Sequence, residues 1–300
     1  SLTASGAMVT SASPAAIFPT SSMERLVPLS VIVPAARVGA SDRMGGFSPE
    51  EKQQSKQNRP VMSLFQLRQT VLLLITATIW GLSFVAQSVG MDHVGPFTFT
   101  ASRMFLGALV LLPFVLWNRS RLAASNPAEH TRRTSPAYMK MLLLGGAACG
   151  LCLFGGESLQ QFGLVHDTEV GKAGFITALY IVLVPMIGLA LGRRTGWLVW
   201  AAVAVAIGGL WFLCVPPEGF SVRLGDLYTL LCAFVFSLHI LVISHFVTKV
   251  NGVELACGQF VCGSIIASAA VLIAESPTIE GLQGALLPIL WAGIMSNGIA

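Results

Sequence analysis

Among the charged side chains inside the long hydrophobic stretches of this 300-residue sequence, three stand out as candidates: Arg103, Glu157 and Lys172. A charge within a bilayer is costly, and its usual reason is function. At the rise of an α-helix, the three lie at roughly similar depth, in the outer half of a membrane. The hypothesis that follows is that Glu157 pairs with Arg103 or with Lys172, and that substrate or a proton competes for the pair.

The alternatives for these charges are structural. Lys172 can extend to the outer headgroups and pair with Glu169 on the neighbouring turn. Arg103 and Glu157 can form an ion pair that only holds helices together. A buried carboxylate that takes up a proton would suit proton coupling, so a proton stays open as a coupling ion.

Uncharged polar residues in the same stretches are candidates of second rank for hydrogen bonding to a substrate. They are Gln160, Gln161, Gln259, His239, Tyr180, Ser83 and Asn297. Such residues more often join helices to one another, and for His239 packing is favoured over a proton relay. Trp80 is also a candidate for the substrate site, although with Gly81 it can instead permit close helix approach.

Neither a metal site nor a cofactor site is predicted. All six cysteines lie in apolar segments, and Cys149 and Cys152 form a C-x-x-C with no second pair and no nearby histidine. They are interpreted as small apolar helix residues rather than as metal or redox groups. Gly146 and Gly150 are four residues apart, which is the spacing of close helix contacts in membranes.

Composition requires that these residues be positioned by membrane helices. The sequence is 54% hydrophobic and only 11% charged, whereas soluble domains carry about 25% charged residues. Apolar runs near the ~20 residues that cross a bilayer recur along the chain. The eight segments are about 69–90, 96–117, 139–164, 168–191, 196–215, 225–247 and 253–274, with an eighth from near 284 that is cut off at 300. The predicted fold class is an all-α integral membrane protein, a polytopic helical bundle embedded in a lipid bilayer.

Residues 1–62 are rich in Ser, Ala, Pro and Gly and are predicted to be disordered. One alternative is an over-extended reading frame in which Met62 is the true start. Another is an organellar transit peptide, since Arg25, Arg37 and Arg43 outnumber the acids there.

Charge in the connections predicts the orientation. Bases gather before the first segment and after the second, fourth and sixth, where Arg119, Arg133, Arg193 and Lys249 are examples. The other connections carry Asp92, Asp167, Glu218, Glu275 and Glu280, with Arg223 the only base. The positive-inside rule therefore predicts a cytoplasmic N-terminus in a multi-pass protein of the cell's inner, cytoplasmic membrane.

A weak internal repeat relates the sixth and seventh segments to the first and second. Without gaps, Trp80 falls on Phe236 and Arg103 falls on Gln259. The first segment would point outward and the sixth inward, so the repeats have opposite topology if each holds five helices.

Residues 75–90 (ITATIWGLSFVAQSVG) and 95–113 (GPFTFTASRMFLGALVLLP) resemble the opening helix pair of the EamA family in the drug/metabolite transporter (DMT) superfamily. Residues 173–192 and 196–213 are similar to that family's fourth and fifth helices. The resemblance implies ten helices in two inverted five-helix repeats, here 63–217 and 218–300, with two further helices and the rest of the eighth expected beyond Ala300. One departure is Gly192-Arg193, where the family often has Gly-Glu.

The function predicted is secondary transport. The resemblance implies an exporter of small metabolites, amino acids or related compounds, that works by alternating access. Neither an enzyme nor a nucleic-acid partner is expected. No metalloprotease, serine-hydrolase, P-loop or dinucleotide motif occurs. The alternatives are a membrane-embedded enzyme and a structural or receptor membrane protein without transport activity.

Overall fold

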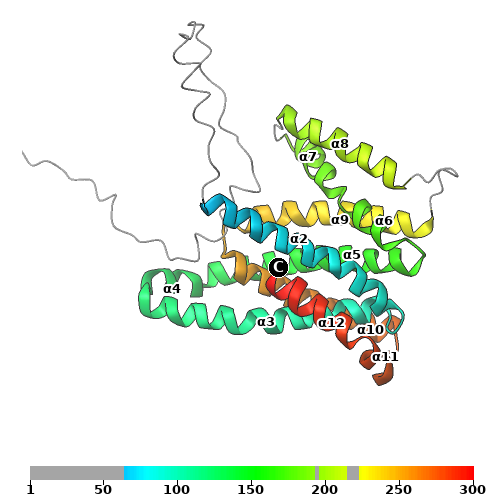
Figure 1. Ribbon diagram of the computed structural model, residues 1–300. Coiled ribbons are helices and arrows are strands. Elements are labelled where there is room, and N and C mark those ends of the chain that lie inside the picture. The colour runs from blue at the N-terminus through cyan, green and yellow to red at the C-terminus, as the bar shows by residue number, and fades with distance from the viewer. Residues whose placement is uncertain (1–63, 193–195, 215–222) are drawn as a thin grey trace, which may run out of the picture. The chain divides into compact units, whose positions relative to one another are not determined.

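The computed structural model describes residues 64–192, 196–214 and 223–300 (Figure 1). The predicted tail over residues 1–62 and the departure at Arg193 lie outside these residues. The helices are α2 (Leu64–Met91), α3 (Pro96–Ser125), α4 (Pro127–Thr134), α5 (Pro136–Val165), α6 (Val170–Thr177), α7 (Tyr180–Ala190), α8 (Trp197–Cys214), α9 (Leu224–Phe246), α10 (Gly252–Ala274), α11 (Ile279–Gly284), α12 (Leu286–Leu290) and a π-helical segment (Trp291–Ile299). Residues 64–73 are the first turns of α2, and Leu74–Ala300 form the compact unit described below.

Six helical stretches are long and apolar enough to cross a membrane. They are Leu67–Met91, Pro96–Ser125, Pro136–Val165, Val170–Ala190, Leu224–Phe246 and Gly252–Ala274. Two shorter apolar helices, Trp197–Gly209 and Leu286–Ile299, match the fifth and eighth predicted segments. The described residues form helices and no strands, so the predicted all-α membrane fold is confirmed.

The connection after the second segment is more helical than its charge suggested. Helix α3 continues to Ser125, and α4 follows directly. Asn126 Oδ1 accepts the Glu129 backbone N–H at 3.2 Å, and Pro127 opens α4. A proline fits this first helical position because its missing N–H would have no partner there. Hydropathy alone did not show this helix because most residues of α4 are polar or charged.

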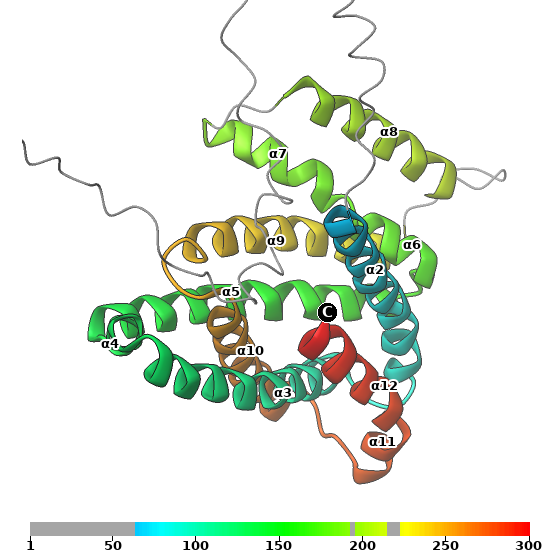
Figure 2. The same cartoon turned by 60° about the vertical axis from the view of Figure 1, so that its left-hand side comes forward.

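The fourth segment is not one uniform helix. It divides into α6 and α7 at Ala178 and Leu179, where Leu179 N–H bonds the Ile176 carbonyl, three residues back, at 3.1 Å. Such tightened turns interrupt the regular α-helical ladder. Helix α9 packs against α5, α6 and α7, and α8 packs on α6 and α7 (Figure 2).

Glycines bring α5 and α10 into close contact. A Cβ on Gly146 would lie 3.1 Å from the Gly258 carbonyl carbon, so the two backbones meet directly. One turn on, Gly150 faces the backbone of Gln259 and Gly263. The predicted close contact at Gly146 and Gly150 is therefore confirmed, and it seats α10 between α5 and α3.

Replacing Gly150 by Ala is expected to destabilise the protein by about 1–3 kcal/mol through overpacking. The added Cβ would lie 2.7 Å from the Gln259 carbonyl oxygen and 2.9 Å from the Gly263 nitrogen, and neither backbone atom can rotate away. Thermal unfolding in detergent measures the effect. Gly208→Ala on α8 is the matched control, because nothing lies within 4 Å of its Cβ; equal loss in both variants would contradict the packing argument.

An acid-sensitive charge cluster stabilises α4. Glu129 accepts from Arg132 Nε and Nη2 and from Arg133 Nε, each at 2.7 Å. The hydrogen bonds from Arg132, and then those from Arg133, lower the pKa of Glu129 to about 2 from its usual 4.5. A pKa lowered by folding means that the carboxylate stabilises the folded state above pH ~4.5, and that this contribution is lost as the pH falls toward ~2.

Hydrogen exchange at the α4 amides is accordingly expected to speed up as the pH is lowered through that window, after correction for the intrinsic exchange rate. Glu129→Gln has no charge to lose, so its corrected α4 exchange is expected to stay flat over the same range. A wild-type α4 that is equally protected at both ends of the window would contradict the role of Glu129.

Candidate functional site

Arg103 and Glu157 meet in the interior of the protein. They lie on α3 and α5, and only 5% and 4% of their surfaces are exposed. Arg103 Nη2 lies 3.4 Å from Glu157 Oε1 and donates to Asn297 Oδ1 at 3.1 Å. Asn297 Nδ2 in turn donates to the Arg103 carbonyl at 3.3 Å. Three segments distant in sequence therefore converge on one guanidinium group.

Small residues let the π-helical segment approach Arg103. A Cβ on Gly107 would lie 2.8 Å from Asn297 Cβ, and one on Gly293 would lie 3.1 Å from the Arg103 carbonyl oxygen. The π-helical turn widens the helix where Asn297 is presented, and such turns are frequent at functional sites. On α5, Gly156, the residue before Glu157, makes room for the Phe236 ring.

The hydrogen-bonding capacity of this ion pair is only partly used. Arg103 Nε and Nη1 and Glu157 Oε2 are buried and have no hydrogen-bond partner among the described residues. Thr100 Oγ1 and Ser158 Oγ share this property. An ion pair that serves stability alone needs its remaining donors and acceptors satisfied, because burying both charges is expensive. The open donors and acceptor make this pair suited to holding a polar ligand.

Further polar contacts lie along α5. Gln160 Nε2 donates to Thr177 Oγ1 at 3.2 Å and to Cys232 Sγ at 3.8 Å. Gln161 Nε2 donates to Gln87 Oε1 on α2 at 2.9 Å. Gln87 was not singled out from the sequence. These contacts are buried and join α5 to its neighbours, as polar residues in membranes commonly do.

The remaining second-rank candidates lie elsewhere. His239 Nε2 lies 3.0 Å from Gln259 Oε1, which joins α9 to α10. Ser83 Oγ donates to the Ile79 carbonyl of its own helix. Trp80 is 47% exposed, whereas Tyr180 is half-buried. Among the described residues, no hydrogen bond or ion pair connects these five side chains to Arg103 or Glu157.

Lys172 belongs to a different cluster. Its Nζ donates to Asp226 Oδ2 at 2.6 Å, rather than pairing with Glu157 or Glu169. Asp226 also accepts from Thr168 Oγ1 at 3.3 Å and from the Arg223 backbone N–H at 3.0 Å. Sequence reasoning missed Asp226, whose signal was its place in the first turn of α9. Of the two partners predicted for Glu157, the structure therefore pairs it with Arg103, whereas Lys172 pairs with a carboxylate on α9.

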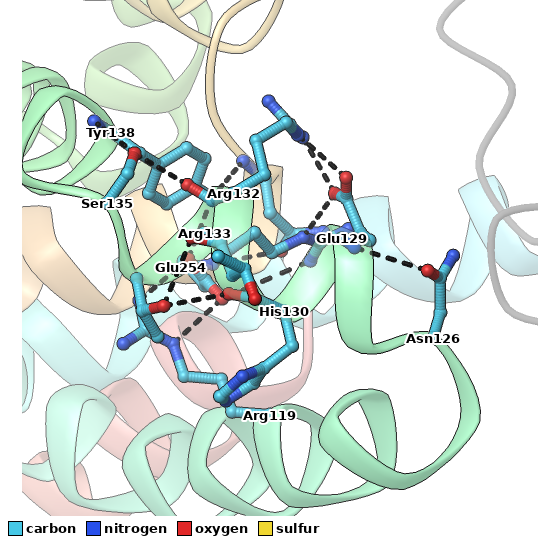
Figure 3. Close-up of polar contacts among 12 residues, drawn as sticks. Arg119, Asn126, Glu129, His130, Arg132, Arg133, Ser135, Tyr138 and Glu254 are labelled. Atoms are coloured by element: carbon cyan, nitrogen blue, oxygen red, sulfur yellow. Dashed lines mark hydrogen bonds and ion pairs between the residues drawn. The ribbon is translucent and has the colours of Figure 1, made fainter.

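Another buried carboxylate organises the base-rich end of the helices (Figure 3). Glu254 on α10 is 3% exposed. It accepts from Arg119 Nε and Nη2 at 3.0 and 2.9 Å and from Tyr138 Oη at 2.8 Å, and Arg133 Nη1 lies 4.0 Å away. Tyr138 Oη accepts the Asn251 backbone N–H at 2.9 Å. The signal in the sequence was an acid close to connections that otherwise carry bases.

The opposite end of the same helices is joined by Glu275. Its carboxylate accepts the backbone N–H groups of Phe97 and Thr98, each at 2.8 Å, and Thr98 Oγ1 at 2.6 Å. A carboxylate there satisfies the free N–H groups of the first turn of α3 and opposes the positive end of its dipole. Glu275 therefore ties the C-terminal end of α10 to the N-terminal end of α3.

Comparisons with known proteins show what this chain resembles. Residues 68–215 match the EamA-like transporter family. Over these residues the chain is similar to that family. It is 30% identical over 197 residues to an uncharacterized transporter of Archaeoglobus fulgidus, a match that covers 62% of this chain and 52% of the relative, so the chain spans about half the length of that protein. The resemblance inferred from the helix sequences is confirmed.

One solved crystal structure is similar to this EamA-like chain in fold. The TM-score is 0.52 with 21% sequence identity, and the match covers 75% of this chain and 74% of the other. At this identity the likeness shows the fold alone. A helical fold of this kind therefore also occurs in an experimentally determined structure.

Proposed function

We propose that this EamA-like protein is a secondary transporter that exports small metabolites, amino acids or related compounds, by alternating access. The observation that carries the proposal is the buried Arg103–Glu157 pair with open donors and an open acceptor. Residues that form an interior charged site at the junction of three helical segments are typical of transport pathways. The match to the EamA-like transporter family supports the same class of function.

The chemistry of the site favours a substrate with both charges. The Arg103 guanidinium recognises a carboxylate through charge-assisted hydrogen bonds. Glu157 Oε2, which has no partner among the described residues, can accept from an ammonium group. Asn297 supplies one donor and one acceptor beside Arg103. A zwitterion would thus replace the Arg103–Glu157 ion pair by two new pairs, one between its carboxylate and Arg103 and one between its ammonium group and Glu157. A proton on Glu157 would compete with the ammonium group of the substrate.

The proposal of alternating access is based on which repeat each of these residues belongs to. Arg103 and Glu157 belong to the proposed first repeat, and Asn297 belongs to the proposed second repeat. A substrate held by both repeats is released when they rock apart on one side. The base-rich end, which carries Arg119 and Arg133, is proposed to face the cytoplasm, and the N-terminus with it.

Flux measured in proteoliposomes tests the function. Proteoliposomes that contain the purified protein and no nucleotide are loaded with an amino acid. Exchange is then compared for three external probes: the same amino acid, its deaminated carboxylic acid and its decarboxylated amine. Saturable exchange of the amino acid in preference to the other two would support the proposal. No exchange of any probe by correctly inserted protein would contradict secondary transport of this class.

A membrane enzyme is the alternative function, and the same experiment separates it. Chromatography of the recovered probe shows whether it was chemically changed. A transporter returns the amino acid unaltered on the other side of the membrane, whereas an enzyme returns a product.

A further inference from the structure

Helices α3 and α10 are fastened to each other at both ends. At one end Arg119 of α3 binds Glu254 of α10 through two hydrogen bonds. At the other end Thr98 of α3 binds Glu275, the residue after α10, through its N–H and its hydroxyl. We call these contacts the Arg119–Glu254 latch and the Thr98–Glu275 latch. The two helices run antiparallel, since the start of each meets the end of the other.

The two latches are counterparts under the internal repeat. Thr98 lies 156 residues before Glu254, and Arg119 lies 156 residues before Glu275, the same offset that places Arg103 on Gln259. A two-fold relation between the repeats requires that a contact between Thr98 and Glu275 be matched by one between Glu254 and Arg119. Both contacts occur, so equivalent positions close the two ends, although with different chemistry.

The middle of the helix pair obeys the same relation. A Cβ on Gly107 would lie 3.4 Å from the Phe260 ring, and one on Gly263 would lie 2.7 Å from Met104 Sδ. Gly107 and Met104 lie 156 residues before Gly263 and Phe260, respectively. Met104 and Phe260 belong to one buried apolar cluster. The axis of the repeat therefore passes through a dry, closely packed centre, which cannot open without creating cavities.

The latches differ from this centre in polarity and position. Along each helix they are 21 residues apart, which at 1.5 Å per residue is about 30 Å, the thickness of the hydrocarbon layer. Each latch thus lies at one membrane surface, where water can replace the hydrogen bonds of a separated pair. Arg103 is five residues from Thr98 on α3, so the Thr98–Glu275 latch closes the nearer approach to the substrate site.

We propose that the two latches are the alternating gates of this protein, and that α3 and α10 pivot about the Met104–Phe260 centre between them. The inference rests on the proposed transport function. In the present structure both latches are closed, which describes an occluded arrangement. Breaking the Arg119–Glu254 latch opens the base-rich side and favours closure of the Thr98–Glu275 latch, because the pivot moves the two ends in opposite senses.

Cysteine accessibility at the two ends tests the gates without any substrate. The native Cys257, one turn from Glu254, is 6% exposed and reports on the base-rich side. Thr100→Cys, introduced at a fully buried position two residues from Thr98, reports on the other side. A membrane-impermeant maleimide is applied to each face of oriented vesicles, and peptide mass spectrometry measures the labelling rate of each cysteine separately.

Arg119→Gln is expected to raise the labelling rate of Cys257 by about tenfold and to lower that of Thr100→Cys, as a bias of ~1.4 kcal/mol between two states would do. Glu275→Gln is expected to produce the reverse pattern. Arg121→Gln is the matched control for the first variant, because Arg121 is exposed and contacts the Trp117 ring on its own helix. Glu280→Gln, at an exposed acid of α11, is the control for the second.

Two results would contradict the gating proposal. Unchanged labelling in both latch variants would mean that the latches are static structural contacts. A simultaneous rise in labelling at both reporter cysteines would indicate that the variants destabilise the protein as a whole. Glu254→Gln removes the other partner of the first latch and must reproduce Arg119→Gln. Reciprocal labelling in a protein that moves none of the flux probes would retain the gates and reject the proposed function. Normal flux in latch variants whose labelling is unchanged would retain the proposed function and reject the gates.

Discussion

Arg103→Gln is expected to lower the affinity for carboxylate-bearing substrates by about tenfold to a hundredfold, because a hydrogen bond to a charged group contributes ~1.5–3 kcal/mol. Glutamine keeps a polar side chain of similar reach but removes the positive charge that the carboxylate and Glu157 both require. The measurement is the concentration dependence of exchange in proteoliposomes, with the amount of inserted protein determined for each variant.

Arg103→Lys is the matched variant for this prediction. It retains the charge but offers a point donor in place of a planar guanidinium, and Asn297 Oδ1 would lose its partner at 3.1 Å or share it. An intermediate loss is therefore expected for Lys. Unchanged half-saturation in both variants would show that Arg103 does not contact the substrate, and would leave its pair with Glu157 as a structural feature.

Asp226→Ala is expected to destabilise the protein by about 2–3 kcal/mol. Asp226 accepts from Lys172, Thr168 and the Arg223 backbone N–H, so its removal leaves a lysine and two further donors without their acceptor. Removing one partner of a fully buried pair costs about 3–5 kcal/mol. The lower figure applies here because the Lys172 side chain keeps 17% of its surface exposed to solvent. Thermal unfolding in detergent measures the loss.

Asp92→Ala is the control for this loss, since Asp92 is an exposed acid of a connection, and its side chain makes no hydrogen bond or ion pair among the described residues. Little change is expected there. Asp226→Asn keeps the acceptor oxygens in part and should lie between wild type and Ala. A melting temperature for Asp226→Ala that equals that of Asp92→Ala would mean that the Lys172 cluster contributes nothing to stability.

Features that depend on local hydropathy could be predicted from the residues. Eight apolar segments, the all-helical membrane fold and the likeness to the EamA family needed only the order of residues, because twenty apolar residues in lipid must form a helix whatever surrounds them. The pairing of Arg103 with Glu157 was one of two alternatives, since few opposite charges within the membrane can satisfy each other.

The tertiary structure alone decided which carboxylate each base meets. Lys172 and Glu157 were predicted to lie at similar depth, yet Lys172 pairs with Asp226 because α6 packs against α9. In the sequence, Glu254 and Glu275 are acids near helix ends with no evident partner. Helix packing places Arg119 beside Glu254 and Thr98 beside Glu275. The depth of a residue in a membrane follows from its position along a helix. The neighbours of its side chain depend instead on how each helix is rotated and which helices are in contact. Glycines such as Gly146 and Gly258 determine those contacts because they let two backbones approach closely.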